Sequence, residues 1–278
     1  MRAGRIRMDP ANAPVVLAAH PDDETIGVGA LLSHLPGSVV IHTTDGAAQG
    51  EGHGFASQRE RGARQAYAQT RRVEVVHALA LAGVTANRVH CLGANDQEAS
   101  FHLAPLSLRL VRFLHDLHPR MLVTHSYEGG HPDHDATAFI AHAAVALLRR
   151  SGGEVPTRLE MTSYNAGSRR LAVADFLQVC DAAAPPLRDD GVVEHVLAPE
   201  ERDLKRRMFA CFETQRRLLE SFPLTIERVR PAPAYAFGRA PHVGLLHYET
   251  LKWQLTGDRW RRLAGAAQAE LGLSSGPL

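Results

Sequence analysis

Two short clusters of histidine and aspartate carry the residue types best suited to metal chemistry. The first reads HPDD at residues 20–23, and the second reads HPDH at residues 131–134. Each cluster offers two possible ligands three residues apart, a spacing that lets both side chains face the same way at the start of a helix. Each cluster could therefore direct two groups at one divalent ion.

The ligand types in these clusters suit a catalytic metal site. Such zinc sites typically use three protein ligands and leave a position open for water. His20 and Asp23 would supply two ligands, and the second cluster would supply the third. Asp22 would lie beside the ion without binding it. Two histidines and a carboxylate also suit non-haem iron(II), and zinc is preferred because hydrolysis needs no redox change.

The elements around the clusters decide whether they can meet. Residues 14–19 and 121–124 are apolar runs that predict buried strands, and each is followed by a cluster and then by a predicted helix. In an open α/β sheet, ligands bind at the carboxyl ends of the strands. Parallel strands share that edge, so we expect the two clusters to converge there.

The remaining pattern predicts an α/β fold. Strand-like runs at 39–43 and 89–92 alternate with helical patterns at 56–81 and 103–117, which implies βαβ units and a mainly parallel sheet flanked by helices. We expect one domain over residues 1–278, with a core at about 14–200 and an irregular C-terminal elaboration at about 201–278.

The last third of the chain has less regular patterns. Residues 227–243 contain three prolines and predict an irregular loop. Trp253 and Trp260 are seven residues apart, which predicts one helix face in contact with the core rather than a platform for a sugar.

Each cluster taken alone has a simpler explanation. Asp22 or Asp23 could cap a helix, and a lone pair of histidines is more often part of a core. His125 is interpreted as a strand-end histidine rather than a ligand. Because both clusters occur, each between a predicted strand and a predicted helix, the metal site is the favoured interpretation.

The paired motifs resemble those of the PIG-L / LmbE-like family of zinc-dependent N-deacetylases. The resemblance covers roughly residues 14–150 and includes the minor motifs TDG at 44–46 and LG at 92–93 with Asp96. It implies a Rossmann-like fold. Arg59 resembles a substrate-side arginine of the family, but an acidic residue often found three positions later is Gly62 here.

The resemblance also implies a role for each matching residue. His20, Asp23 and His134 would bind zinc, and Asp22 would be the base that takes a proton from the metal-bound water. His131 would stabilise the oxyanion or protonate the leaving amine. Substrate contacts are assigned to Asp45, Arg59 and Asp96.

The activity implied is hydrolysis of an N-acetyl or other N-acyl group on an N-acetylglucosaminyl-type substrate, an amino-sugar conjugate. The alternatives are a metal-dependent amidohydrolase or esterase for a non-sugar substrate, and a non-catalytic zinc-stabilised binding module. Asp22 argues against the module, since a structural zinc site is closed and needs no adjacent base.

Composition excludes several other classes. The net charge is +1 with no basic stripe, which argues against nucleic-acid binding. Cys91, Cys180 and Cys211 are far apart, which argues against a disulfide framework. No run has the roughly 20 apolar residues of a membrane span, and no signal peptide is evident, so we expect a cytoplasmic protein. The oligomeric state stays open.

Overall fold

A seven-stranded sheet organises the computed structural model, which describes residues 13–48, 58–165, 172–177, 191–251, 253 and 255–278. The strand order is β3-β2-β1-β4-β5-β9-β8. Strands β1 to β5 run parallel to one another, and β9 pairs antiparallel with both of its neighbours, β5 and β8. The strands are β1 (Val15–Ala18), β2 (Val39–Ala48), β3 (Val89–Asp96), β4 (Met121–His125), β5 (Thr157–Met161), β8 (Val193–Val196) and β9 (Ile226–Pro231). A separate hairpin pairs β6 (Tyr164–Asn165) with β7 (Ala172–Val173).

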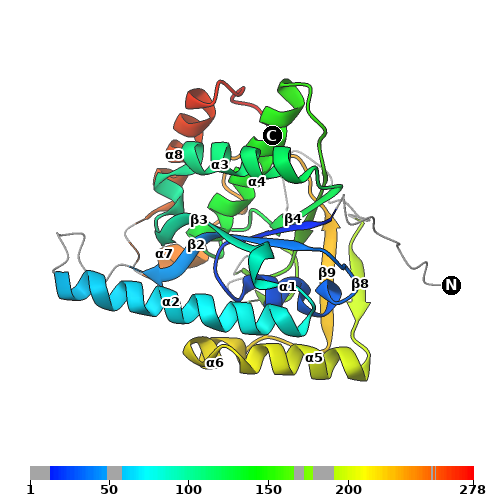
Figure 1. Ribbon diagram of the computed structural model, residues 1–278. Coiled ribbons are helices and arrows are strands. Elements are labelled where there is room, and N and C mark those ends of the chain that lie inside the picture. Colours follow the sequence, from blue (N-terminus) through cyan, green and yellow to red (C-terminus); the bar gives the residue numbers. More distant parts are fainter. Residues whose placement is uncertain (1–12, 49–57, 166–171, 178–190, 252, 254) are drawn as a thin grey trace.

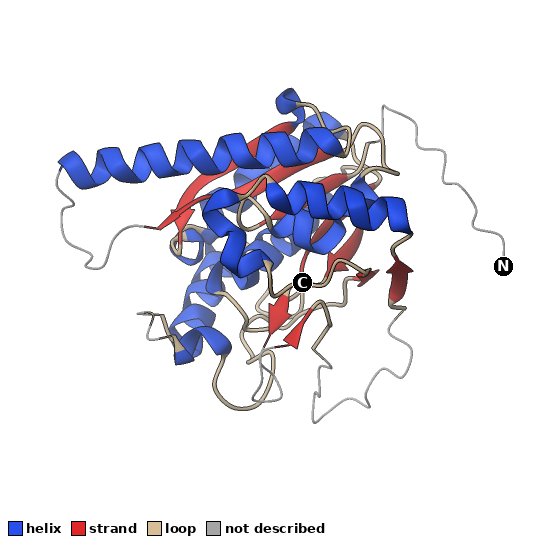
Figure 2. Cartoon of the chain, turned by 90° about the horizontal axis from the view of Figure 1, so that it is seen from below, coloured by secondary structure: helices blue, strands red, loops and turns tan. Residues whose placement is uncertain are grey.

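Helices cover both faces of the sheet (Figures 1 and 2). One face packs against α1 (Asp23–Leu32), α2 (Gln58–Leu81) and α5 (Pro199–Ala210). The other face packs against α3 (Leu103–Leu117), α4 (Pro132–Arg150) and α8 (Gly257–Glu270). Two short helices, α6 (Arg216–Leu219) and α7 (His247–Thr250), lie in the connections. The expected α/β class with a mainly parallel, helix-flanked sheet is confirmed.

The central strands owe their position to their composition. All four residues of β1 are fully buried, with Val15 and Leu17 facing one core and Val16 and Ala18 facing the other. A strand covered on both faces requires such a continuous apolar run. The helix predicted at 103–117 is α3, and its apolar residues face the core beside α4.

Two expectations for the C-terminal region are wrong. Residues 226–231 form β9 within the main sheet, although an irregular loop was expected from residue 227. The prolines of residues 227–243 led to the wrong prediction because Pro231 is the last residue of the strand, where a missing N–H costs little. Trp253 and Trp260 do not share a helix, since α8 begins at Gly257 after the Thr256 cap.

A buried ion pair from the C-terminal half binds the main chain of α1 where the helical geometry is interrupted. The helix loses its regular dihedral angles at Val28. Lys205 donates to the carbonyl of Ile26 at 2.7 Å, and Glu227 accepts the N–H of Ala30 at 2.8 Å. Lys205 and Glu227 also pair with each other at 2.8 Å. Residues from the expected elaboration thus hold the helix that carries the first cluster.

None of the described helices combines the length and the apolar composition that crossing a membrane requires.

Candidate metal centre and active site

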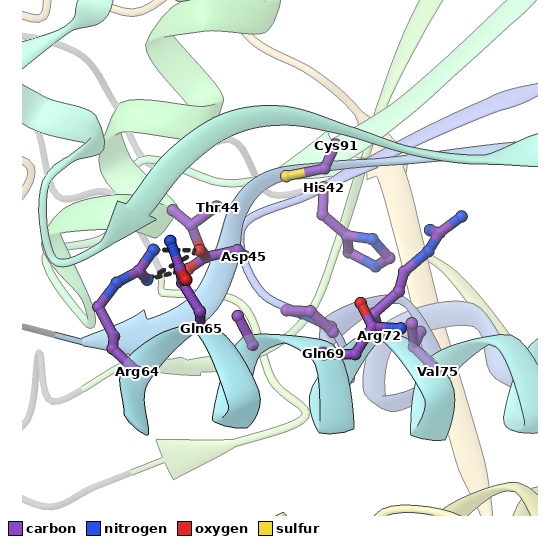
Figure 3. Close-up of a pocket in the computed structure, with 11 residues that line it drawn as sticks. His42, Thr44, Asp45, Arg64, Gln65, Gln69, Arg72, Val75 and Cys91 are labelled. Atoms are coloured by element: carbon purple, nitrogen blue, oxygen red, sulfur yellow. Dashed lines mark hydrogen bonds and ion pairs between the residues drawn. The ribbon is translucent and has the colours of Figure 1, made fainter. Parts of the chain in front are cut away.

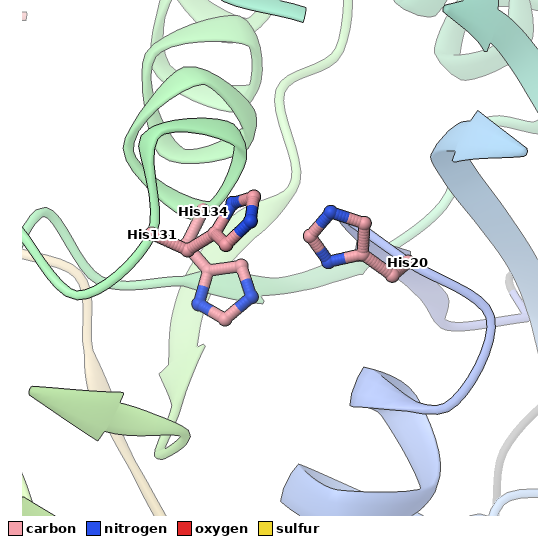
Figure 4. A group of neighbouring side chains, drawn as sticks. All are labelled: His20, His131 and His134. Carbon is pink, nitrogen blue, oxygen red and sulfur yellow. The ribbon is translucent and has the colours of Figure 1, made fainter. Parts of the chain in front are cut away.

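Adjacent parallel strands bring the two clusters together. The first cluster follows β1 and opens α1, and the second follows β4 and opens α4. Because β1 pairs directly with β4, their carboxyl ends lie side by side. The ring centre of His20 lies 4.6 Å from that of His131 and 5.4 Å from that of His134 (Figure 4).

Asp23 links the two clusters through its two carboxylate oxygens. Oδ2 lies 3.1 Å from Nδ1 of His20, and Oδ1 lies 3.3 Å from Nε2 of His134. Three overlapping sets of donor atoms occur here, and within each set the atoms lie within 4.8 Å of one another: His20, His131 and His134; His20, Asp96, His131 and Asp133; and Asp23, His125 and His134. The structure therefore brings the expected ligands together and adds four residues to the candidates, Asp96, His125, His131 and Asp133.

Hydrogen bonds separate the available donor atoms from the engaged ones. Nε2 of His125 accepts the main-chain N–H of Ala19 at 3.1 Å, so its lone pair is already used. Nδ1 of His131 accepts the N–H of Asp133 at 3.1 Å. Nε2 of His134, by contrast, is buried without a hydrogen-bond partner among the described residues. A buried imidazole nitrogen left open beside a carboxylate fits a metal ion.

The far nitrogen of His20 is held by carboxylates. Nε2 lies 3.1 Å from Asp96 and 3.2 Å from Asp133. Asp133 is fixed in turn by the N–H groups of Gln97 and Ala99, at 2.6 and 3.1 Å. This is the arrangement that orients a metal-binding histidine. Asp96, assigned from the sequence to a substrate contact, thus lies against the expected metal ligand His20.

The backbone at Asp22 is strained. Its φ of 152° lies where residues other than glycine are rare, and its side chain makes no capping hydrogen bond to α1. The carboxylate instead pairs with Arg71 of α2 at 3.1 Å. The simple capping explanation for Asp22 is therefore wrong, and the strained conformation turns its carboxylate toward Arg71.

Burial makes Asp22 a weak acid. It raises the pKa of this carboxyl to about 8, against the opposing charge of Arg71. The neighbouring charge of Asp23 raises the pKa further, while His20 lowers it. A carboxyl whose pKa lies near neutrality can both take up and return a proton.

A second buried pair supports the same turn. Glu24 accepts the main-chain N–H of Asp22 at 3.2 Å and contacts Nε2 of His42 on β2 at 2.9 Å. Neither His42 nor Arg71 carries a local signal in the sequence, since one lies within a strand and the other within a helix. Only the fold brings Arg71 to Asp22 and His42 to Glu24.

His131 presents its Nε2 as a donor to the centre. Because Nδ1 accepts a main-chain N–H, the neutral ring carries its proton on Nε2. Burial, together with the nearby His20 and His134, holds the pKa of His131 well below its usual value. A neutral N–H donor of this kind suits a developing oxyanion.

Two aromatic side chains contact histidines of the centre. The ring of Trp253 meets that of His131 edge-on at 4.6 Å, and Tyr164 meets His134 at 5.1 Å. Tyr164 comes close because residue 130 is glycine, where a Cβ atom would lie 2.1 Å from the Tyr164 carbonyl oxygen. Trp260 instead lies fully in the core, stacked on Tyr127, as expected. For Trp253, the expected core contact is wrong.

A cavity of about 270 Å³ lies beside the centre, between α2 and strands β2 and β3 (Figure 3). It is lined by Pro21 of the first cluster and by Asp45. Arg64 holds Asp45 through both carboxylate oxygens, at 2.8 and 3.0 Å. Arg59 lies in the first turn of α2, but its side chain lies outside the described residues.

Comparison with known proteins identifies the motifs. Residues 15–145 match the profile of the PIG-L family, described as GlcNAc-PI de-N-acetylase. A 1D-myo-inositol 2-acetamido-2-deoxy-alpha-D-glucopyranoside deacetylase of Nocardioides sp. is 31% identical over 166 residues, or 48% of this chain. The match covers 53% of that protein, so the chain spans about half the length of this curated relative.

Solved structures share the fold. The A40926 pseudoaglycone deacetylase Dbv21 superposes with a TM-score of 0.55 over 80% of this chain and 97% of its own, at 18% identity. The N,N'-diacetylchitobiose deacetylase of Pyrococcus horikoshii gives a TM-score of 0.50 over 75% and 73%, at 16% identity. At these identities the likeness establishes the fold.

Proposed function

We propose, on the premise that residues 15–145 belong to the PIG-L family, that the chain is a zinc-dependent N-deacetylase for an N-acetylglucosaminyl-type substrate. The observation that carries the proposal is the buried Nε2 of His134, which has no hydrogen-bond partner among the described residues and lies beside the carboxylate of Asp23. Asp22, which precedes Asp23 in the chain, has a raised pKa. The Nocardioides relative acts on an acetamido-glucopyranoside, which supports an amino-sugar substrate.

His20, Asp23 and His134 are the proposed ligands. The hydrogen-bond pattern supports this set. His125 and His131 each use the lone pair of one ring nitrogen to accept a main-chain N–H, so the other nitrogen of the neutral ring carries a proton and offers no lone pair to an ion. A bound zinc ion would polarise the amide carbonyl and lower the pKa of a nearby water. Iron(II) suits the same donors, so the native ion is a matter for elemental analysis.

Asp22 is the proposed proton carrier. Its carboxylate accepts a proton from the attacking water, and its raised pKa keeps that proton available for a later transfer. Arg71 and Glu24 hold the carboxylate and the backbone of Asp22, so little motion is needed during the reaction. An amide nitrogen must be protonated before it leaves, and Asp22 can return the proton to it.

His131 is the proposed oxyanion donor. Its Nε2–H is free to donate because Nδ1 is occupied by the N–H of Asp133. Removal of one such donor typically lowers kcat by about 10²–10³-fold. Asp45 and Arg59 remain the proposed sugar contacts, and Arg64 joins them because it shares the carboxylate of Asp45. Asp96, in contact with His20, is proposed to act on the metal side of the pocket as well.

Release of free amine tests the activity directly. The purified chain is incubated with N-acetylglucosamine conjugates and with N-acetyl amino acids, each with and without a chelator. Chelator-sensitive amine release from the sugar conjugates alone is expected. Release from the amino-acid amides instead would favour the alternative of a non-sugar amidohydrolase, and release unaffected by full metal removal would contradict the metal mechanism.

An Asp22→Asn variant tests the proton carrier. We expect kcat to fall by about 10²-fold or more while the bound metal per chain stays unchanged, because the amide keeps the shape but cannot take a proton. Metal content by elemental analysis and kcat are measured on the same preparation. Asp116→Asn, a change at an exposed surface carboxylate, is the control. Wild-type kcat in Asp22→Asn would remove Asp22 from the mechanism.

A further inference from the structure

Three side chains converge on the molecular surface near the C-terminal end of α1. His34 lies just beyond the end of α1, His195 lies on the edge strand β8, and Glu201 lies in the first turn of α5. One ligand atom from each lies within 4.8 Å of the other two. Their side chains are 57%, 31% and 13% exposed, so solvent reaches the cluster from one side.

Both histidines point at the same carboxylate oxygen. Nε2 of His34 lies 2.6 Å from Oε1 of Glu201, and Nε2 of His195 lies 2.8 Å from the same atom. Their ring planes are nearly perpendicular, at 81°. Two imidazole nitrogens and one carboxylate oxygen therefore lie within 4.8 Å of one another, and these are donor types found in many divalent metal sites.

The carboxylate is held in place independently of the histidines. Its other oxygen, Oε2, accepts the main-chain N–H of Ala198 at 2.7 Å. The carboxylate therefore keeps one orientation whether or not the histidines contact it, and a ligand oriented by a second hydrogen bond is typical of metal sites.

An ion would need the two rings to move outward. Ligand bonds of about 2.1 Å in tetrahedral geometry separate neighbouring donor atoms by about 3.4 Å. The nitrogen–oxygen distances of 2.6 and 2.8 Å are shorter, and the partly exposed rings of His34 and His195 have solvent on one side into which they can move. The other exposed histidine pair, His115 and His118, has no such shared oxygen, since each contacts a different carboxylate.

We propose that His34, His195 and Glu201 form a second divalent-cation site, suited to Zn²⁺ or a similar first-row ion, which ties the end of α1 to β8 and α5. Three protein ligands leave positions for water. The ion takes the place of the Nε2 protons of His34 and His195, each neutral ring then carries its proton on Nδ1, and any second proton is released to solvent. The site is separate from the proposed catalytic ion and does not depend on the proposed function. Its effect would be to fasten C-terminal elements to the helix that begins with Asp23.

Counting bound zinc separates the two sites. Tag-free protein is dialysed to equilibrium against buffered free Zn²⁺, and zinc per chain is measured by elemental analysis. We expect two equivalents for wild type, one for His34→Ala, one for His134→Ala and none for the double variant. His118→Ala, an exposed histidine outside the cluster, should keep both equivalents and is the matched control.

Glu201→Gln checks the role of the anion. Glutamine retains an oxygen for the N–H of Ala198 but removes the negative charge, so it should lose the second equivalent while the helix stays intact. A zinc content per chain that neither His34→Ala nor Glu201→Gln lowers overturns the proposal. Loss of zinc only in His134→Ala would support the catalytic site and not this one.

Thermal unfolding tests the link between the elements. Saturating zinc should raise the Tm of wild type by about 5 °C more than it raises that of His34→Ala, which keeps only the proposed catalytic ion. If zinc binds at this cluster while the Tm stays the same, the ion does not fasten the elements together, and that part of the proposal is wrong.

Discussion

At the residue scale, Asp22 depends on its neighbours for both its conformation and its charge. A φ of 152° is costly for aspartate, by about 1–3 kcal/mol, and persists only where surrounding contacts fix it. Those contacts come from Glu24, which holds its N–H, and from Arg71, which holds its carboxylate. The strain therefore serves to aim one carboxylate, as strained residues at functional sites often do.

Arg71 is a positioning residue whose removal tests this idea. It also donates to the carbonyls of Pro21 and Gly46, at 2.7 and 3.2 Å, so it ties both flanks of the site together. In Arg71→Met we expect kcat to fall by about 10²-fold with KM changed little, because the base is misplaced rather than the substrate pocket. Steady-state kinetics measure the split between the two constants.

The conservative and control variants sharpen that test. Arg71→Lys keeps a cation beside Asp22 and should recover part of the lost kcat. Arg72→Met removes the next arginine, which donates to the carbonyl of Val89 at 2.6 Å, and should leave kcat near the wild-type value. An equal loss in all three variants would indicate general damage to α2 and count against positioning.

At the element scale, the connection before α8 brings an aromatic ring to the centre. The main-chain N–H of His247 binds the carbonyl of Gly129 at 2.8 Å, which fastens α7 to the loop before the second cluster. Glu249 then accepts the N–H groups of Leu246 and Gly257, at 2.8 Å each. This short helix thereby sets the path of the chain that carries Trp253 to His131.

Trp253→Ala should weaken substrate binding. The indole ring is half-buried beside His131 and offers a flat apolar surface to a sugar ring. Loss of an aromatic contact of this kind costs about 0.5–1.5 kcal/mol, so we expect KM to rise by about 3–10-fold with metal content unchanged. Leu245→Ala, at an exposed side chain in the same segment, is the control. An unaltered KM would exclude Trp253 from the substrate wall.

At the scale of the whole molecule, two cores on opposite faces of one sheet are closed by C-terminal residues. Trp260 and Phe237 are fully buried in the core beside α4, and Met208 and Phe212 are fully buried in the core beside α2. Buried titratable groups inside these cores make the stability of the fold sensitive to pH. His142 of α4 is one of them.

His142 is predicted to lower stability in acid. Burial lowers its pKa to about 3 from the ordinary value of 6.5, so the unfolded chain binds a proton that the folded chain rejects. Stability is therefore complete above the unfolded pKa and decreases as the pH falls from 6.5 toward 3. Between about pH 7.5 and about pH 5, the free energy of unfolding should decrease by about 2 kcal/mol on this account.

Denaturant unfolding of a His142→Phe variant measures this contribution. The variant keeps a ring against Tyr235 and Phe237 but cannot titrate, so its free energy of unfolding should depend less on pH by about the same 2 kcal/mol. It loses the hydrogen bond from Nδ1 to the main-chain oxygen of Leu278, which shifts its stability at every pH alike. Equal pH slopes for wild type and variant would contradict the assignment.

The sequence alone predicted the residues that are proposed to carry the chemistry of the centre. Metal ligands of the proposed type need specific side chains at fixed spacing, and the buried strands before them need continuous apolar runs, so both are visible locally in residues 14–23 and 121–134. The parallel sheet then follows from the alternation of strands and helices. The family resemblance rests on the same local motifs, and residues 15–145 match the PIG-L profile.

Only the tertiary structure decided which residues surround that chemistry. Arg71, His42 and Trp253 reach the centre from α2, β2 and the segment before α8, and nothing in their own neighbourhood in the chain marks them. Residues 226–231 became a strand because β5 and β8 offered hydrogen-bonding edges, which local proline content cannot reveal. Contacts between distant segments depend on packing, and packing is a property of the whole fold.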